Sequence, residues 1–403
     1  MSVELTRSSD HDFSTLHQRM QHYIDQELLS CCYSLVLHGT DVVDYRCFGY
    51  MELEGKTPLR EDAIYRMYSN TKLCTSIALM ILHERNKFDL DDPLEKYLPE
   101  FGDMQVLKAD AKSIDDTVPS NSSMTPRQLL SHSAGLSYGF IEPESVIDNA
   151  YLTGGLNILG GYDETLADMS ARLGNFPLCY QPGTQWRYSF ATDVCARLVE
   201  VLSGTSFDEF LRTEIFAPLQ MHDTDFHVPV EKQDRFTTMY AGIDPLDPMK
   251  PGLVKADDPY SGTYSKPKKL LSGGGGLVST VADYLSFIQM IINGGEWQGN
   301  RIIGSDTLAL MRTNQLADGT SVEFPMWSMP GTVFGLGFAL RQEPAPGDSE
   351  KTRDEYHWGG MAGTHTWMAP RANIAGFCLT QRMPGFWHPF SHEFRQLAYE
   401  SAP

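Results

Sequence analysis

Ser69 and Lys72 stand at the start of the segment SNTKLCTSIALMILHER (residues 69–85), whose apolar body predicts a buried helix. A serine hydroxyl becomes a good nucleophile only when a neighbouring group takes its proton. If Ser69 opens the helix, Lys72 lies on the same helical face, and burial favours its neutral amine over the ammonium. The helix N-terminus also favours a developing oxyanion. The pair therefore predicts a serine nucleophile with lysine as its proton acceptor.

Two other segments carry competing serine motifs. Ser265 and Lys268 have the same spacing, but Pro267 between them makes a poor helix start, so we interpret this segment as a charged loop. Residues 135–139, GLSYG, match the GxSxG pattern of the α/β-hydrolase nucleophile. That pattern needs a buried strand before the serine, and here a predicted helix end precedes it. We therefore rank Ser137 below the first pair.

Two further segments could complete such a site. Tyr188 follows a Pro-Gly turn and precedes a helix predicted from about Ala191. A tyrosine near a lysine can act as general base or return a proton to a leaving group. In the segment YHWGGMAG (residues 356–363), glycines let the backbone approach a substrate, and an amide there could share an oxyanion with the amide of Ser69. Taken singly, a core tyrosine and a glycine bulge at a strand edge explain these residues equally well.

The elements that must position these residues are divided unevenly along the chain. Apolar alternation predicts strands near both ends, whereas the middle holds helical patterns and Gly/Pro-rich loops. We therefore expect an α/β (α+β) architecture: residues 1–98 and 269–403 form one domain, a mostly helical domain (residues 99–268) is inserted, and the active site lies in the cleft between them. The predicted terminal helices are residues 12–29, 281–294 and 391–401, and the predicted strands are residues 33–39, 42–53, 365–371 and 375–383.

The composition is that of a globular enzyme and excludes several partners. The 403 residues are 41% hydrophobic and carry a formal net charge of −20, so we expect neither nucleic acid nor an anionic membrane as partner. The seven cysteines show no CxxC spacing, and we expect neither a metal nor an organic cofactor. No secretory leader and no apolar run of ~18 residues is visible. We expect a cytoplasmic protein, either monomer or homodimer, that acts on a small molecule.

Together these segments resemble the serine β-lactamase and penicillin-binding-protein-like superfamily, and within it the family VIII carboxylesterases and class C β-lactamase-like esterases and transesterases. The resemblance covers most of the chain, in order and spacing, through RMYSNTK, KFDLDDPLEKYLPEF, TPRQLLSHSAGL, PGTQWRYS, IFAPLQMHDTDF, GGGGLVSTVADYLSF and HWGG. It implies a β-lactamase/transpeptidase-like fold, in which an antiparallel sheet is flanked by helices.

The resemblance also implies roles for individual residues. Ser69 resembles the acylated serine, Lys72 its partner and Tyr188 the tyrosine of the second family motif. The oxyanion amides would be those of Ser69 and Gly360, with Met361 possible if the register differs by one. The expected substrate-binding residues are His357, Trp358, Gly359, Phe190 and Tyr138. The aromatic segments expected to line the cleft are residues 138–140, 260–264 and 324–327.

Two departures from the family pattern narrow the expected activity. The Tyr-x-Asn motif of β-lactamases is replaced by Tyr188-Ser189-Phe190, which removes an amide that contacts the substrate. His357-Trp358 stands in place of Lys-Thr in the KTG-type strand, which weakens a carboxylate-binding group. We therefore expect a carboxylesterase for short- to medium-chain esters. The alternatives are an acyltransferase of the same fold, a weak β-lactamase or D-peptide hydrolase, and a catalytically silent binding or scaffold relative.

Overall fold

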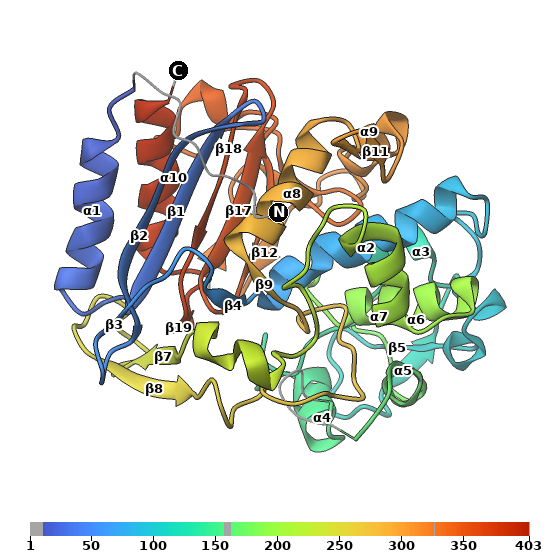
Figure 1. Cartoon of the computed structure of the whole chain (residues 1–403). Helices are drawn as coiled ribbons and strands as arrows, with labels where there is room; N and C mark the ends of the chain where they lie inside the picture. Colours follow the sequence, from blue (N-terminus) through green and yellow to red (C-terminus); the bar gives the residue numbers. More distant parts are fainter. Residues whose placement is uncertain (1–10, 157–162, 326, 403) are drawn as a thin grey trace.

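The chain folds around one eight-stranded sheet that both ends of the sequence build (Figure 1). The computed structural model describes residues 11–156, 163–325 and 327–402. Every neighbouring pair in the sheet is antiparallel, and β18 joins the C-terminal strands to the N-terminal hairpin by pairing with β1. The strand order is β14 (Thr332–Phe334), β15 (Ala339–Arg341), β16 (Tyr356–Gly360), β17 (Thr364–Ala369), β18 (Ile374–Leu379), β1 (Cys31–His38), β2 (Asp41–Glu52) and β3 (Thr57–Pro58).

Helices cover both faces of this sheet because successive side chains along its strands point to opposite faces, and both faces are apolar. On one face lie α1 (Ser14–Asp25) and α10 (Pro389–Ser401), where Phe394 packs edge-on against Trp367 of β17 at 5.3 Å. On the other face lie α2 (Thr71–Glu84) and α8 (Val281–Ile292), and Tyr284 of α8 meets Phe377 of β18. The sheet therefore buries both faces and forms a rigid base beneath the start of α2.

The middle of the chain adds a helical layer beside α2, as the sequence predicts. Its helix α6 packs against α2 in the interior, and α7 follows it closely in the chain (Figure 1). The strands β7 and β8 also belong to this middle segment, yet β7 pairs with β19 near the C-terminus. The predicted division at residues 98 and 269 stays a prediction. The bounds are α3 (Pro126–Leu130), α4 (Val146–Thr153), α5 (Leu166–Leu173), α6 (Ala191–Ser203), α7 (Phe207–Leu211), β7 (Met239–Gly242), β8 (Leu253–Asp257) and β19 (Arg382–Met383).

The predicted terminal helices and strands are present with bounds shifted by a few residues, and the predicted first helix is shorter at its C-terminal end. Several short paired segments give no sequence signal because two or three residues hold too little periodicity. These are β4 (Ile64–Arg66), β5 (Gln105–Leu107), β6 (Thr117–Pro119), β9 (Val278–Thr280), β10 (Glu296–Trp297), β11 (Asn300–Arg301), β12 (Glu323–Phe324) and β13 (Trp327–Ser328); the helix α9 spans Ser305–Met311.

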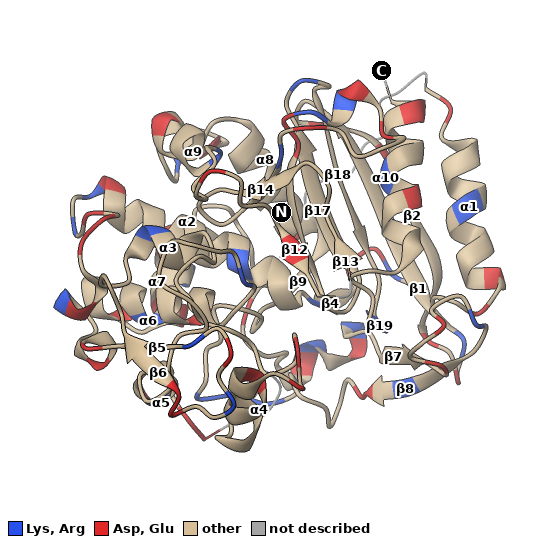
Figure 2. Ribbon diagram, turned by 180° about the vertical axis from the view of Figure 1, so that it is seen from behind, with Lys and Arg blue, Asp and Glu red and all other residues tan. Residues whose placement is uncertain are grey.

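Charged residues of both signs are spread over the outer helices and loops, and the central strands carry few of them (Figure 2). This distribution agrees with a sheet that is buried on both faces. Within the described ranges, no helix is both long and apolar enough to cross a membrane.

Candidate active site

Ser69 lies in a strained turn that follows a short strand. The strand β4 pairs with β9, and the chain then makes one 3₁₀ turn, Tyr68–Asn70, directly before α2. Tyr68 has a φ of 44°, which is costly for a residue with a side chain. Hydrogen bonds on both sides of Met67 hold this conformation. The Met67 amide donates to the Leu277 carbonyl at 2.9 Å, and the Met67 carbonyl accepts from Thr364 Oγ1 at 3.0 Å. These hydrogen bonds therefore fix the backbone that carries the nucleophile.

The start of α2 has no side-chain cap. Neither Ser69 nor Asn70 caps α2 through its side chain. Instead Asn70 Nδ2 donates to the Thr364 carbonyl at 2.9 Å, which ties the turn to β17. The serine lies in the turn before the helix, so its hydroxyl is left free for chemistry.

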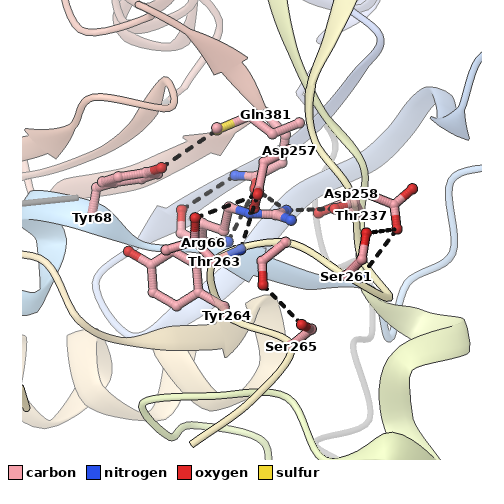
Figure 3. A network of polar contacts seen from close by, with 12 residues as sticks. Arg66, Tyr68, Thr237, Asp257, Asp258, Ser261, Thr263, Tyr264, Ser265 and Gln381 are labelled. Atoms are coloured by element: carbon pink, nitrogen blue, oxygen red, sulfur yellow. Dashed lines mark hydrogen bonds and ion pairs between the residues drawn. The ribbon is translucent and has the colours of Figure 1, made fainter. Parts of the chain in front are cut away.

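Arg66 anchors the strand that leads to the turn (Figure 3). Its guanidinium is fully buried, donates to Asp257 Oδ2 at 2.7 Å and to the Thr237 carbonyl at 2.6 Å, and lies over the Phe236 ring. Its backbone exchanges hydrogen bonds with the Gln381 side chain, at 3.1 and 3.2 Å. These contacts come from three separate segments, so the position of β4 is set by the tertiary structure.

Ser69, Lys72 and Tyr188 are brought together as the sequence predicts. The hydroxyl oxygens of Ser69 and Tyr188 are 2.6 Å apart, and Lys72 Nζ lies 3.4 Å from Ser69 Oγ. Lys72 is 2% exposed, whereas Ser69 is partly accessible. A hydroxyl that a reactant can reach therefore faces two buried groups that can take its proton.

Lys72 is oriented by two further oxygens. Its Nζ donates to the Gly274 carbonyl at 2.6 Å and to the Tyr138 hydroxyl at 3.0 Å. It also lies 4.7 Å from the centre of the Tyr188 ring. Tyr138 is thus a partner of the lysine and is 2% exposed; its predicted role as a substrate contact stays a prediction. Burial and the Asp193 carboxylate hold the pKa of Tyr138 well above its ordinary value, so it stays protonated.

Tyr188 is held by an aromatic wall. Trp358 of β16 donates its indole N–H to the Tyr188 hydroxyl at 3.3 Å, and Phe324 packs beside the ring at 5.7 Å. The imidazole of His132 lies 5.0 Å from the same ring. Burial and the charge of Lys72 hold the pKa of His132 well below its ordinary value, so the imidazole is neutral.

The glycines of β16 pass close to the turn that carries the nucleophile. A Cβ on Gly360 would lie 2.3 Å from the Met67 carbonyl oxygen and 3.2 Å from Tyr68 Cβ, so only glycine fits there. A Cβ on Gly359 would similarly meet His365. The close approach agrees with the predicted oxyanion amide at Gly360. That role, and the alternative at Met361, stay predictions.

Two predicted substrate contacts point elsewhere. His357 neighbours Trp358 along β16, so the two side chains lie on opposite faces of the sheet. His357 faces Glu355, 3.2 Å away, and lines a cavity of about 220 Å³ beside α10 that does not include Ser69. Phe190 is 2% exposed and packs against the Tyr138 ring at 4.5 Å. His357 and Phe190 therefore contact other side chains of the protein, and their predicted roles in substrate binding stay predictions.

The competing motifs are structural. Ser137 is fully buried, donates to Asp148 Oδ1 at 2.5 Å and accepts from Arg187 Nε at 2.6 Å, so its hydroxyl is enclosed between a carboxylate and a guanidinium. Ser265 donates to the Gly262 carbonyl at 2.8 Å, and Lys268 lies over the Tyr264 ring at 3.8 Å. Neither serine is arranged as a nucleophile.

The aromatic segments predicted to line the cleft differ in position. Phe324 borders Tyr188, and Tyr264 packs edge-on against Tyr68 at 5.9 Å, so both reach the surroundings of the nucleophile. Tyr260 is 62% exposed on the outer surface. Among the described residues, no group of three or more His, Cys, Asp or Glu side chains is arranged to hold a metal ion.

One residue of this site carries no sequence signal. Asp193, the third residue of α6, is 1% exposed and accepts hydrogen bonds from Ser272 Oγ, the Gly274 amide and the Tyr138 hydroxyl. An acidic residue in the first turn of a helix is common, because its negative charge interacts favourably with the positive end of the helix dipole. Only its burial against the partners of Lys72 distinguishes it.

The sheet, its helical layers and the serine–lysine–tyrosine group define a β-lactamase-like serine hydrolase of the penicillin-binding-protein-like superfamily. The family model described as Beta-lactamase matches residues 16–399, and the chain belongs to this family.

Relatives with different names share this architecture. The chain is 30% identical over 367 residues to an uncharacterized protein of Mycobacterium tuberculosis, covering 89% of this chain and 88% of that protein. It is 28% identical over 376 residues to Esterase EstB of Burkholderia gladioli, covering 90% and 89%. The solved structure of EstCE1, a hydrolase with promiscuous acyltransferase activity, has the same fold, with a TM-score of 0.80 at 23% identity over 96% of this chain and 99% of that chain.

Proposed function

We propose that the chain is a carboxylesterase that hydrolyses short- to medium-chain carboxylic esters through an acyl-enzyme on Ser69. The observation that carries this proposal is the position of the Ser69 hydroxyl, 2.6 Å from the Tyr188 hydroxyl and 3.4 Å from Lys72 Nζ. The similarity to Esterase EstB supports the ester class.

In the acylation half, Ser69 Oγ attacks the ester carbonyl while its proton passes to Lys72, directly or through Tyr188. The carbonyl oxygen becomes an oxyanion, which the amides of Ser69 and Gly360 stabilise. Tyr188 then gives a proton to the departing alcohol, and Lys72 gives Tyr188 a proton in return. The neutral Trp358 N–H donates to the Tyr188 oxygen and would stabilise negative charge that develops there.

In the deacylation half, a water molecule takes the place of the alcohol. It loses its proton along the same route, attacks the acyl carbon and releases the acid, and Ser69 recovers its proton. Every proton has a donor and an acceptor among Ser69, Lys72 and Tyr188.

The preference for esters over β-lactams rests on what replaces the polar family motifs. Phe190 has no amide to offer and its ring is buried against Tyr138. His357 points away from the nucleophile toward Glu355, so no cation of this strand faces a substrate carboxylate. A β-lactam or peptide would thus lose contacts that an uncharged short ester does not need.

The test compares a p-nitrophenyl ester series of increasing acyl length with nitrocefin, on the purified chain. We expect turnover of short to medium esters at least about 100-fold faster than nitrocefin, since one lost charge-assisted contact costs about 2–3 kcal/mol. Nitrocefin turnover equal to that of the best ester would contradict the proposal. Mass spectrometry after a serine-directed phosphonate should place a single adduct on Ser69; no adduct would favour a silent relative.

An acyltransferase is the second candidate, because EstCE1 is described as a hydrolase with promiscuous acyltransferase activity. The acyl-enzyme would be the same, and an alcohol would replace water. Adding a short alcohol to the ester assay distinguishes the two: a new ester formed faster than the free acid would favour acyl transfer.

A further inference from the structure

Asp193 is a buried carboxylate that faces the polar surroundings of Lys72. Its Oδ1 accepts from Ser272 Oγ at 2.5 Å and from the Gly274 amide at 2.9 Å, and its Oδ2 lies 3.4 Å from the Tyr138 hydroxyl. It has no hydrogen bond to the nucleophile itself among these contacts, so any effect on the nucleophile passes through its partners.

Asp193 contacts both residues whose oxygens hold Lys72. Lys72 Nζ donates to the Gly274 carbonyl and to the Tyr138 hydroxyl, while the carboxylate accepts from the Gly274 amide and from the Tyr138 hydroxyl. The fit is tight: a Cβ on Gly274 would lie 2.4 Å from Asp193 Oδ2 and 2.7 Å from the Tyr138 hydroxyl oxygen. Any other residue at this position would push the carboxylate or the Tyr138 hydroxyl away.

The directions of these hydrogen bonds follow from the groups involved. An ionised carboxylate only accepts, so Tyr138 donates its one proton to Asp193 and its oxygen accepts from Lys72. In the form that accepts the serine proton, Lys72 is a neutral amine with two N–H bonds and one lone pair. With both N–H bonds directed to Gly274 and Tyr138, the lone pair is left for the third direction, where Ser69 Oγ lies at 3.4 Å.

We propose that Asp193 is a positioning residue for the serine nucleophile: by holding the Gly274 amide and the Tyr138 hydroxyl it fixes the two residues that aim the Lys72 amine at Ser69. When Lys72 takes the serine proton, the serine O–H bond breaks and a third N–H bond forms on the amine. The nearby carboxylate then balances the new ammonium charge. This inference rests on the part of the proposed function in which Lys72 accepts the proton.

The test measures how fast Ser69 reacts with a p-nitrophenyl phosphonate, a probe that needs the activated serine but no ester turnover. The serine oxygen forms the P–O bond, p-nitrophenolate leaves, and Lys72 holds the proton. In Asp193→Asn the shape is kept, but the amide must turn an N–H toward one of three donors. We expect the rate to fall on the order of 100-fold, as for loss of an oriented general base.

Asp283→Asn is the matched control. Asp283 is also the third residue of a helix, is 7% exposed, and accepts from the Asp223 amide at 2.7 Å and from Thr224 Oγ1 at 2.9 Å. Neither partner contacts Lys72. We expect D283N to react within about threefold of the wild type while urea unfolding shows a comparable loss of stability in both variants. Equal phosphonylation rates for D193N and D283N would overturn the proposal.

Two further variants keep the test decisive if D193N does not fold. Tyr138→Phe removes the link from the carboxylate to Lys72, and Ser272→Ala removes one donor that holds the carboxylate. We expect each to slow phosphonylation about tenfold and, in the ester assay, to lower kcat with KM within about twofold, because each side chain acts through Lys72. Wild-type rates in both variants would overturn the inference. Rapid phosphonylation of a wild type that hydrolyses no ester would instead overturn the proposed function.

Discussion

Ser69 and Ser137 are two serines in motifs that other hydrolases use for nucleophiles, and the chain treats them in opposite ways. Ser69 is partly accessible, and its hydroxyl faces Lys72 and Tyr188. Ser137 is fully buried, and its hydroxyl joins Asp148 to Arg187. The Ser137 hydroxyl is already hydrogen-bonded to a carboxylate and a guanidinium. The Ser69 hydroxyl instead faces an amine and a phenol, which can take up or give back a proton.

The difference shows that a nucleophile is defined by what surrounds its hydroxyl, and motif spacing alone does not supply this. The pair Ser265 and Lys268 makes the same point. It repeats the spacing of Ser69 and Lys72, but it lies in a loop where the lysine stacks on Tyr264. Burial lowers the pKa of Lys268 to about 8, so a perturbed lysine is also insufficient without a serine beside it.

The largest expected effect separates the two serines directly. Ser69→Ala removes the atom that attacks, so we expect ester turnover to fall by about 10⁵-fold or more. Ser137→Ala should retain kcat within about threefold of the wild type. Initial rates with the best p-nitrophenyl ester measure both variants. A loss in Ser137→Ala that matches Ser69→Ala, with a folded protein, would return Ser137 to the role of nucleophile.

The second prediction separates the two lysines. Lys72→Met keeps the apolar stem but removes the proton acceptor, and we expect kcat to fall by about 10²- to 10⁴-fold. Lys268→Met is the control, since its amine contacts the Tyr264 ring and not the nucleophile. We expect that variant to change kcat less than about threefold. Similar losses in the two variants would mean that the cleft needs positive charge in general and not a base at Lys72.

Most of the fold was predictable because long strands and helices carry clear periodicity. The start of α2 and the strands of residues 364–379 are of this kind. The site was predictable only where spacing along the chain carries chemistry, as for Ser69 and Lys72. The contacts of Asp193 and the inward ring of Tyr138 join segments far apart in sequence, and no local pattern encodes them. The side of the sheet to which His357 points was not predictable, because a glycine-rich strand lacks the apolar alternation that would indicate it.

The third prediction concerns the structural role of Ser137. Its replacement by alanine leaves Nε of the partly buried Arg187 and the buried Asp148 carboxylate without this hydroxyl, and a buried polar group without a partner costs about 1–3 kcal/mol. We expect the free energy of unfolding in urea to fall by that amount in Ser137→Ala. In Ser69→Ala the corresponding change should be below about 1 kcal/mol, because its hydroxyl is partly open to water. The two variants would then show opposite patterns of activity and stability, and equal stability losses would contradict the contrast.

The smallest effect tests His132, which links the two regions: its carbonyl accepts from the Arg187 amide beside Ser137, and its ring packs on Tyr188. Its folded-state pKa lies well below 6.5, so above about pH 6.5 the imidazole is neutral in both folded and unfolded chains. Below that pH only the unfolded chain binds the proton, and the free energy of unfolding falls by up to about 1.4 kcal/mol per pH unit. We expect His132→Asn to lose this slope between pH 6.5 and 5 in urea titrations.

His388→Asn is the control: the pKa of His388 is lowered to about 4, and this residue caps α10 away from the cleft. Both variants should flatten the stability profile, but only His132→Asn should also change kcat; a His132→Asn profile parallel to that of the wild type would contradict the neutral imidazole beneath Tyr188.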